Sequence, residues 1–293
     1  MNKLYLRENE EYIDLDDGNS RLLNFYYNTF IGRIFLKLIT NKFVSRLYSY
    51  YTKSSFSKHK IKKYIKQYEI DLDDYKSKEY KCFNDFFIRQ RKNNTFEKDK
   101  NIFISPCDAK LMAFDITKDL SLNIKNSKYL IKELINDEEV AKRYSNGICL
   151  VFRLALEDYH RYCYIDSGKQ KNNIKIKGVL HTVRPIAQKR YKVFSENSRE
   201  WTVLHTDNFG DIIQIEVGAI LVGKIKNHTQ NNKFQKGEEK GYFEYGGSTI
   251  ILLIEDKKLL IDEDILKNSK KGIETKVKLG EKIGIKNCEG KIC

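Results

Sequence analysis

One segment indicates the central strand of this chain: Lys236-Gly-Glu-Glu-Lys-Gly-Tyr-Phe-Glu-Tyr-Gly246-Gly247-Ser248-Thr249, which runs directly into Ile-Ile-Leu-Leu-Ile254. The continuous apolar run predicts a buried strand. The two glycines predict a tight turn before it, because glycine adopts backbone conformations that are closed to other residues. Ser248 then begins the strand with little steric cover. An isolated Gly-Gly-Ser-Thr is usually an ordinary hairpin turn, so its meaning depends on the rest of the chain.

Short β-rich runs between Gly, Asn and Asp turns make up most of the chain after Thr95. They cover residues 102–104, 111–114, 148–154, 174–183, 212–217, 219–225 and 249–255, with one helix candidate at 131–144. Strands and helices do not alternate at the spacing of βαβ units, which argues against a doubly wound parallel sheet. We therefore predict an α+β fold, in which a helical N-terminal region (1–95) caps a mostly antiparallel, sandwich- or barrel-like β core (96–293).

The N-terminal region combines helical periodicity with charge of one sign. Apolar and aromatic residues recur at helical spacing over 19–53, as one amphipathic helix or a helix pair, and again over 58–68. Residues 33–66 contain ten Lys or Arg and no Asp or Glu. A solvated helix face is the plain alternative, but an anionic membrane surface suits basic residues that lie beside an apolar face.

The overall composition narrows the class of protein. There are 54 Lys and Arg against 40 Asp and Glu, a net charge of +14, which favours an anionic partner. No helix-turn-helix, RNP-type or zinc-finger pattern occurs, so nucleic acid is not the predicted partner. An apolar content of 41% excludes a wholly disordered chain. The six cysteines form no Cys-x-x-Cys pair, so no metal site is predicted. The polar start of the chain and the lack of a long apolar run predict a reduced, cytosolic protein that touches membranes only peripherally.

Further motifs accompany the glycine turn, in a defined order along the chain. They are Phe83-Asn-Asp-Phe86-Phe87-Ile-Arg89, Ser105-Pro-Cys-Asp108, Leu156-Glu-Asp158-Tyr159-His160-Arg161, Leu180-His181-Thr-Val-Arg184-Pro185, Phe194-Ser-Glu196-Asn197-Ser-Arg199 and Val217-Gly-Ala-Ile-Leu-Val-Gly-Lys-Ile225. Each motif alone is weak. Taken together and in this order, they resemble the phosphatidylserine decarboxylase family over residues 80 to 256.

The resemblance implies a pyruvoyl-dependent carboxy-lyase of phospholipid biosynthesis, made as a self-cleaving proenzyme. Ser248 Oγ would attack the Gly247 carbonyl, and β-elimination would leave a beta chain (1–247) and an alpha chain (248–293) that begins with a pyruvoyl group made from Ser248. That group would form a Schiff base with phosphatidylserine, release CO2 and give phosphatidylethanolamine. It would serve as the electron sink in place of pyridoxal phosphate, so neither that cofactor nor a metal is predicted.

The base that activates Ser248 is open at this stage, because serine is a weak nucleophile without one. Asp108 matches the aspartate of the family's relay. Many family members carry Tyr-His-Arg-x-His, but here His160 is followed by Cys163 at the second histidine position. His160 could serve both steps, Cys163 could act as a thiolate beside Arg161, or His181 could fold in. Imidazole is best matched to proton transfer near neutral pH, which favours His160.

The predicted partners follow from the same resemblance. They are phosphatidylserine in an anionic membrane and the two cleaved chains themselves, as a heterodimer whose further oligomerisation stays open, at the cytoplasmic side of the cell membrane. Arg184 stands where the family usually has Asn, and adds a cation that could meet a phosphate or a carboxylate. Two alternatives remain. One is a non-catalytic basic module for lipid or nucleic acid, uncleaved because Cys163 replaces the relay histidine, and the other is a decarboxylase of a soluble amino acid.

Overall fold

The predicted apolar strand lies at the centre of the fold as β16 (Ser248–Ile254), paired with β12 (Gly210–Gly218) on one side and β7 (Ile148–Leu154) on the other. This computed structural model describes residues 2–15, 21–124, 127–220, 224–228 and 233–288. All seven residues of β16 are buried. A strand that is covered on both faces has apolar residues at every position, which explains the sequence pattern.

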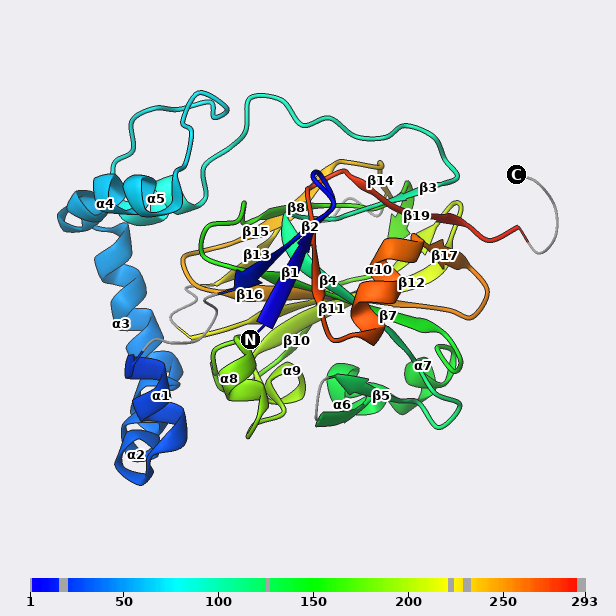
Figure 1. The fold of residues 1–293 in the computed structure, drawn as a ribbon, viewed down its shortest axis with the longest axis horizontal. Coiled ribbons are helices and arrows are strands. Elements are labelled where there is room, and N and C mark those ends of the chain that lie inside the picture. The colour runs from blue at the N-terminus through cyan, green and yellow to red at the C-terminus, as the bar shows by residue number, and fades with distance from the viewer. Residues whose placement is uncertain (1, 16–20, 125–126, 221–223, 229–232, 289–293) are drawn as a thin grey trace.

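In the described part of the chain, β16 belongs to an 11-stranded sheet that is not closed into a barrel (Figure 1). Its order is β14 (Lys233–Phe234), β9 (Gly168–Gln170), β11 (Arg199–Thr206), β12, β16, β7, β4 (Ala109–Asp115), β18 (Glu274–Val277), β1 (Asn2–Leu6) and β2 (Glu11–Leu15), with β10 (Ile174–Ile176) paired to β11. The strand pairs described are antiparallel except for β1 and β18, which are parallel.

Smaller sheets and short helices cover the large sheet. The sheets are β13 (Ile225–Asn227) with β15 (Glu239–Phe243) and β8 (Arg161–Cys163), then β17 (Leu259–Ile261) with β19 (Lys282–Lys286) and β3 (Ile102–Ile104), and β5 (Ser121–Ile124) with β6 (Ser127–Leu130). The helices are α6 (Ile131–Ile135), α7 (Glu138–Lys142), α8 (Pro185–Gln188), α9 (Val193–Glu196) and α10 (Glu263–Lys270).

The alternation of side chains along β16 divides the core into two clusters. Ile250 and Leu252 contribute to one cluster together with Phe243 of β15. Ile251 contributes to the other cluster together with Phe194 of α9. Successive strand residues point to opposite faces of a sheet, so the first cluster lies under the β13–β15–β8 sheet and α10, and the second under α6, α7 and α9.

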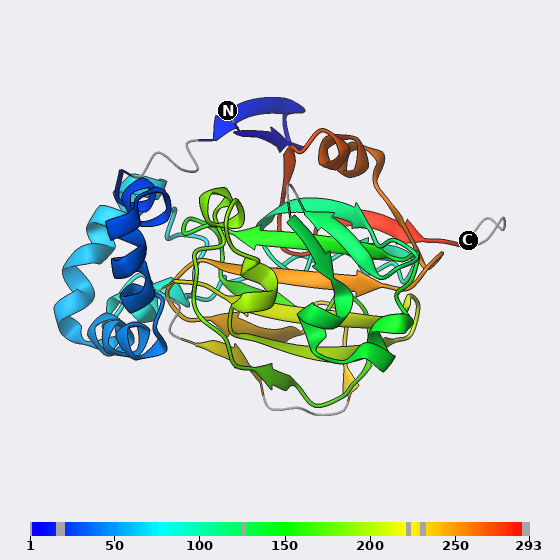
Figure 2. The same ribbon diagram turned by 90° about the horizontal axis from the view of Figure 1, so that it is seen from below.

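The N-terminal helices form a separate block beside the sheet, at the left of Figures 1 and 2. They are α1 (Arg21–Asn28), α2 (Phe30–Ile39), α3 (Lys42–Lys53), the 3-10 turn η1 (Ser55–Lys58), α4 (His59–Tyr68) and α5 (Phe83–Phe87). The chain turns between α1 and α2 at Thr29, whose hydroxyl accepts a hydrogen bond from the amide of Gly32 at 2.9 Å. A side chain on Gly32 would collide with the Phe25 carbonyl, so glycine permits the two helices to approach closely.

The α+β class and the mostly antiparallel core are confirmed. The helix expected over 131–144 is divided into α6 and α7 because Asn136 adopts a left-handed conformation with φ of +55°. The strand expected over 174–183 is limited to β10. Of the strand expected over 219–225, residues 221–223 lie outside the described residues, and β13 begins at Ile225. The hairpin of β1 and β2 was not expected, and it adds strands to the region 1–95, whose boundary with 96–293 stays a prediction.

Candidate active site

Ser248 begins the central strand and is fully buried, opposite Gly218 of β12 and Leu154 of β7. The loop that connects β15 to β16 carries the two glycines. Gly246 has a φ of +137°, in the region that residues with side chains rarely adopt. A methyl group built on Gly247 would meet one side-chain atom, at 3.6 Å. The turn expected before Ser248 is therefore present, but Gly246 and Ser248 are both buried, so the expectation that the serine has little steric cover is wrong.

His160 is the titratable group next to Ser248. Its Nδ1 lies 3.4 Å from Ser248 Oγ, and its Nε2 lies 3.0 Å from the carbonyl oxygen of Ala155. A carbonyl only accepts, so Nε2 carries the proton and Nδ1 is free to accept the hydroxyl proton of Ser248. Burial lowers the pKa of His160 from its ordinary value to about 4, although the nearby Asp158 carboxylate opposes the shift. The imidazole is therefore a neutral base at physiological pH.

Residues of α5 contact both His160 and the loop that carries the two glycines. The ring of Phe87 stacks on His160, with 4.1 Å between the centroids and 28° between the planes. Asn84 Oδ1 accepts a hydrogen bond from the amide of Tyr245 at 3.2 Å, just before the glycines. Phe83 and Phe87 both pack edge-on against the Tyr245 ring. The aromatic motif near the N-terminal region thus assembles the site, a role that sequence reasoning did not assign to it.

Asp158 is a further residue at the site that sequence reasoning did not single out. It is 3% exposed, and its Oδ2 accepts from the Ala155 amide at 2.7 Å, which orients the carbonyl that holds His160. Its other oxygen pairs with Lys276 of β18. The neighbouring ion pair of Arg153 and Glu274, with Nε to Oε1 at 2.9 Å, joins β7 to β18 in the same way. A carboxylate after an apolar strand was visible in the sequence, but its partner more than a hundred residues away was not.

Asp108 directly precedes β4, and in the described structure its carboxylate is bonded to groups other than His160 and Ser248. Its two oxygens accept from Arg91, at 3.2 Å and 2.5 Å, and Oδ1 also accepts from the amide of Leu279 at 2.8 Å. The Arg91 guanidinium in turn lies 4.6 Å above the ring of Tyr159. Among the described contacts of Asp108, none is with His160 or Ser248.

Cys163 is buried in β8, opposite Glu239 of β15, and its amide donates to the carbonyl of Pro106 at 2.9 Å. Burial raises the pKa of its thiol, so the thiolate is disfavoured near neutral pH. The cation that might have stabilised a thiolate, Arg161, is paired with Glu239 at 2.6 Å. In the described residues, no hydrogen bond connects Cys163 to Ser248.

His181 is also nearly buried, but it faces the N-terminal helices. Its Nδ1 lies 3.3 Å from the Tyr27 hydroxyl of α1, and its ring stacks on Tyr191 at 4.1 Å. Burial lowers its pKa as well. Of the three candidate bases, His160 is therefore the one that the described structure brings to Ser248.

A cavity of about 240 Å³ adjoins the glycine turn. Its walls are mostly apolar and come from α1, the end of β7, the segment before α8 and the loop before β16. They comprise Leu22, Leu23, Arg153, Leu154, Ala155, Leu156, Thr182, Val183, Arg184, Ile220, Tyr245, Gly246 and Gly247. Because this cavity reaches the Gly247–Ser248 turn, it is the candidate site for a small substrate group.

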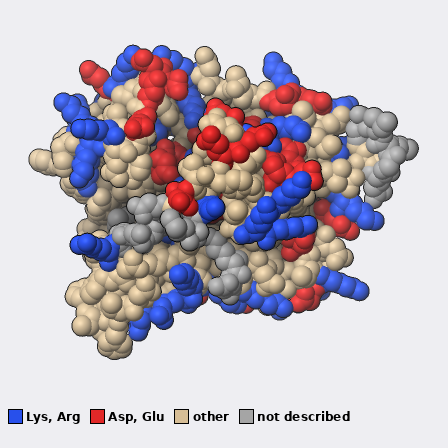
Figure 3. Space-filling view, viewed as in Figure 1, with Lys and Arg blue, Asp and Glu red and all other residues tan. Residues whose placement is uncertain are grey.

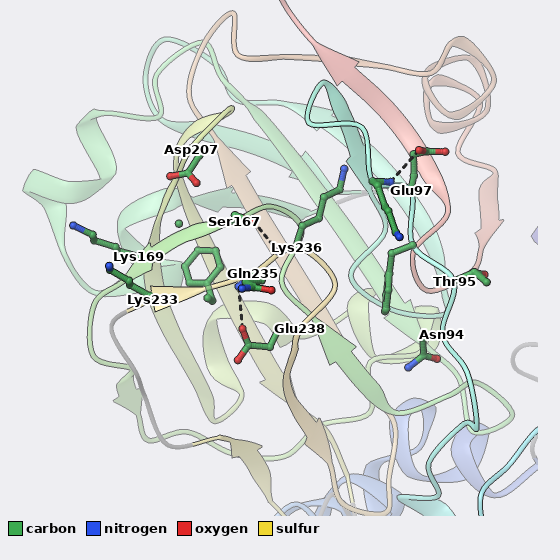
Figure 4. Close-up of a pocket in the computed structure, with 14 residues that line it drawn as sticks. Asn94, Thr95, Glu97, Ser167, Lys169, Asp207, Lys233, Gln235, Lys236 and Glu238 are labelled. Carbon is green, nitrogen blue, oxygen red and sulfur yellow. Dashed lines mark hydrogen bonds between the residues drawn. The ribbon is translucent and has the colours of Figure 1, made fainter.

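A wider cavity of about 980 Å³ lies over β9 and β14, away from Ser248 (Figure 4). Its walls carry charges of both signs, including Lys169, Lys233 and Asp207. Several of its polar groups bond to one another or to the backbone: the amide of Gln235 donates to Glu238 Oε2 at 2.9 Å. The wider cavity thus contains none of the candidate catalytic residues. The described residues contain no cluster of three or more metal-ligating side chains.

A buried serine at a glycine turn, beside a neutral histidine with a free ring nitrogen, has the parts of an enzyme that uses serine as a nucleophile. Comparison with known proteins identifies the family to which the chain belongs. The family described as phosphatidylserine decarboxylase matches residues 83–285. The chain belongs to this family, and is therefore a decarboxylase, a carboxy-lyase.

Individual relatives match over nearly the whole chain. The chain is 54% identical to phosphatidylserine decarboxylase proenzyme 2 of Clostridium acetobutylicum over 268 residues, which are 90% of this chain and 92% of the relative. It is 44% identical to the phosphatidylserine decarboxylase proenzyme of Clostridium botulinum over 297 residues, 98% of this chain and the full length of the relative. The corresponding proenzyme of Clostridium tetani is 44% identical over 298 residues, 98% of this chain and 99% of the relative.

Proposed function

We propose that this chain is a pyruvoyl-dependent phosphatidylserine decarboxylase, made as a proenzyme that cleaves itself between Gly247 and Ser248. The observation that carries the proposal is the 3.4 Å approach of His160 Nδ1 to Ser248 Oγ, at the end of a glycine turn. The family membership and the proenzymes named among the relatives support the substrate and the need for cleavage.

Self-cleavage begins with the removal of a proton from Ser248 by His160. Ser248 Oγ adds to the Gly247 carbonyl carbon and the amide C–N bond breaks, which gives an ester and a free amino group on residue 248. Loss of the α-proton of residue 248 then breaks the ester C–O bond, leaves a carboxylate on Gly247 and forms dehydroalanine. Addition of water releases ammonia and leaves the pyruvoyl group. The neutral imidazole suits the first proton transfer, because a base must be unprotonated to accept.

The remaining candidate residues receive supporting roles. The thiol of Cys163 stays protonated because burial raises its pKa, so we assign both self-cleavage and decarboxylation to His160. Asp108 accepts from Arg91 of the large chain and from the Leu279 amide of the small chain, and its carboxylate therefore helps to hold the two chains together. A direct relay contact between Asp108 and the base stays a prediction.

In the mature enzyme, the pyruvoyl group supplies the electron sink that decarboxylation of an α-amino acid requires. The chain at residue 248 suits such a group, because the position is buried and adjoins the 240 Å³ cavity. His160 Nδ1 carries no proton in the resting site, so it first accepts one from the substrate ammonium group and then returns it to the substrate carbon after CO2 has left. Ala155 and Asp158 keep the imidazole in the required orientation through the Nε2 contact.

The two chains remain associated as a heterodimer in this proposal. After cleavage, β16 of the small chain stays paired with β12 and β7 of the large chain. The pairs Arg153–Glu274 and Asp158–Lys276 then become contacts between chains. Separating the two partners of a buried ion pair costs free energy, because each charge loses its counter-charge. These contacts therefore oppose dissociation of the two chains.

Access to the lipid is proposed to come through the N-terminal helices, which expose an unusual number of large apolar side chains. These are Leu22, Phe25, Phe30, Ile31, Ile34, Phe35, Leu38, Phe43, Leu47, Tyr50 and Phe56. Figure 3 shows Lys and Arg flanking this lobe, at the left of the view. In the described part of residues 33–66, Lys53 alone has an ion-pair partner, Glu244. Such a surface binds the headgroup region of an anionic bilayer, at about 1 kcal/mol for each basic residue.

No helix in the described residues is long and apolar enough to cross a membrane. We infer that the protein lies peripherally at the cytoplasmic face of the cell membrane, where the free thiols of Cys82, Cys107, Cys149 and Cys163 stay reduced. Replacing Phe30 and Phe43 together by Ser should weaken sedimentation with phosphatidylserine vesicles. The matched control is Leu260→Ser, which removes an apolar side chain of 49% exposure far from the helices. Equal sedimentation of the two variants would contradict the docking surface.

The experiment that tests the proposed function is the intact mass of the purified protein, followed by CO2 release from phosphatidylserine. We expect chains 1–247 and 248–293, with the small chain lighter by one ammonia than a peptide that begins with Ser, and a single uncut chain for Ser248→Ala. An uncut wild-type chain would favour the non-catalytic binding module. A cleaved chain that decarboxylates free serine but not phosphatidylserine would favour a soluble substrate.

A further inference from the structure

Arg184 lines the cavity beside Gly247 and has no counter-ion among the residues that the structure describes. Its side chain is half-buried, and its guanidinium has no hydrogen bond or ion pair with another described residue. The other arginine of the cavity, Arg153, is already paired with Glu274. No Asp or Glu lies among the described residues that line the cavity. A half-buried cation in an apolar wall is poorly compensated, so this cavity is built to receive an anion.

The position of Arg184 is defined by its neighbours. It directly precedes Pro185, which begins α8, and its backbone is extended with φ of −67° and ψ of 153°. Burial raises the pKa values of Tyr68 and Tyr245, and the charge of Arg184 opposes both shifts. The guanidinium therefore lies within electrostatic reach of two phenols, one on α4 and one in the loop that leads into the glycines. It lines the cavity together with Leu22 of α1 and with Gly247 of the glycine turn.

We infer that Arg184 binds the phosphate of the substrate headgroup, and so selects a phosphodiester of serine over free serine. This inference rests on the proposed function. Phosphatidylserine offers two anionic groups, the carboxylate and the phosphodiester. A cation on the carboxylate would stabilise the ground state more than the transition state, because the negative charge moves from the carboxylate oxygens into the electron sink as neutral CO2 forms. The phosphodiester keeps its charge throughout the reaction, and guanidinium matches phosphate geometry with two parallel hydrogen bonds.

The dimensions of the headgroup agree with this assignment. The phosphorus atom is three bonds from the carbon that carries the amino and carboxylate groups. A residue that binds the phosphate must therefore line the same small cavity as the reacting position, and Arg184 and Gly247 both line it. Leu22 of α1 forms another wall and is 59% exposed. The acyl chains can thus leave the cavity along the exposed apolar face of the helices while the headgroup enters.

The kinetic signature follows from the chemistry. A contact that is equally strong in the ground state and in the transition state lowers KM and leaves kcat unchanged. Removal of a charge-assisted hydrogen bond to phosphate should raise KM by about 10- to 100-fold. We expect Arg184→Gln to show that increase for phosphatidylserine in vesicles, with kcat within about twofold of wild type and with normal self-cleavage. The KM of Arg184→Lys should lie between those of wild type and Arg184→Gln, because Lys keeps the charge but cannot form two parallel hydrogen bonds to the phosphate.

The control variant is Arg190→Gln, which removes an exposed cation just after α8 and outside the cavity. We expect its KM and its vesicle sedimentation to equal those of wild type. Vesicle sedimentation of Arg184→Gln should also be unchanged, since the phosphate contact forms inside the cavity. As a readout independent of activity, glycerophosphoserine should bind to Ser248→Ala in calorimetry and should fail to bind to the double variant Ser248→Ala/Arg184→Gln.

Each contrary result has a distinct meaning. An unchanged KM, a fall in kcat alone, or failure of Arg184→Gln to self-cleave would overturn the phosphate assignment. A loss of vesicle sedimentation that matches the rise in KM would show that Arg184 contacts the membrane surface instead, and would also overturn it. A cleaved wild-type protein that releases no CO2 from phosphatidylserine would refute the proposed function itself, and is recognised before any variant is measured.

Discussion

The pH dependence of self-cleavage should identify the base that activates Ser248. Burial lowers the pKa of His160 from 6.5 to about 4, and only the neutral imidazole accepts the hydroxyl proton. At pH 5.5, a group with a pKa of 4 is about 97% neutral, whereas one with a pKa of 6.5 is about 9% neutral. The rate at pH 5.5 should therefore be close to its value at pH 7.5, about tenfold higher than an ordinary histidine would allow, and it should halve near pH 4.

The assay begins with the full-length precursor, trapped unfolded in urea immediately after cell-free translation. The precursor is diluted into buffers from pH 4 to pH 10, and the appearance of the 248–293 chain is followed on gels. Folding must be checked at each pH, because His160 is protonated below pH 6.5 in the unfolded state but stays neutral down to about pH 4 in the folded state. Stability is thus lost as pH falls from 6.5 to 4, by about 3 kcal/mol for this group. Trp201, the one tryptophan and 3% exposed, reports folding by its fluorescence.

Two results would refute this reasoning. A rate that rises tenfold for each pH unit above pH 7 would identify a thiolate as the base, because burial raises the pKa of Cys163. A rate that halves near pH 6.5 in a folded protein would mean that His160 is solvated in the reacting state. The variants separate the same alternatives: Cys163→Ala should cleave like wild type, and His160→Ala should cleave at least about a hundredfold more slowly.

Two further predictions concern stability and the glycine turn. In the uncleaved Ser248→Ala chain, whose unfolding involves a single chain, Glu274→Gln leaves the buried Arg153 without its full counter-charge. It should lower the free energy of unfolding, measured by urea titration, by about 3–5 kcal/mol. Glu263→Gln, which removes one partner of an exposed ion pair on α10, should leave the urea midpoint unchanged, and equal midpoints for the two variants would contradict the role of the buried pair. Gly246→Ala should slow self-cleavage, because a side chain at φ of +137° strains the backbone by about 1–3 kcal/mol next to the scissile carbonyl. Gly272→Ala, also at positive φ but with nothing within 4 Å of its added methyl group, should cleave at the wild-type rate, and a similar delay in both variants would mean that the turn has no special part in the reaction.

The elements that could be predicted from the sequence are those with a strong local pattern. Strands β7 and β16 lie within a residue of their expected ranges, since continuous apolar runs identify strands covered on both faces. The hairpin of β1 and β2 was missed, because it is polar and its partner strand β18 is distant: Leu4 pairs with Glu274. Such a pairing depends on tertiary contacts that no local pattern expresses.

In the candidate site too, local motifs could be predicted from the sequence and long-range contacts could not. The closeness of His160 and Ser248 was expected from their motifs, and the structure brings them together. The partners of the carboxylates were not expected, because Lys276 and Arg91 stand in segments with no distinctive pattern. Each of these ion pairs joins segments that are far apart in the sequence, and a single sequence does not show which segments become neighbours in the fold. The catalytic roles of Asp108 and Cys163 therefore stay predictions.

In the proposed two-chain enzyme, the central position of β16 makes assembly dependent on the order of folding and cleavage. Before cleavage, the strand enters between β12 and β7 as part of one continuous chain, so its pairing is unimolecular. Once the chain is cut at the proposed bond, an unfolded 248–293 segment can diffuse away, and reassembly becomes dependent on concentration. A protein of this kind persists because it unfolds slowly, and not because it refolds. Each molecule is consequently folded once, and molecules lost to denaturation are replaced only by new synthesis.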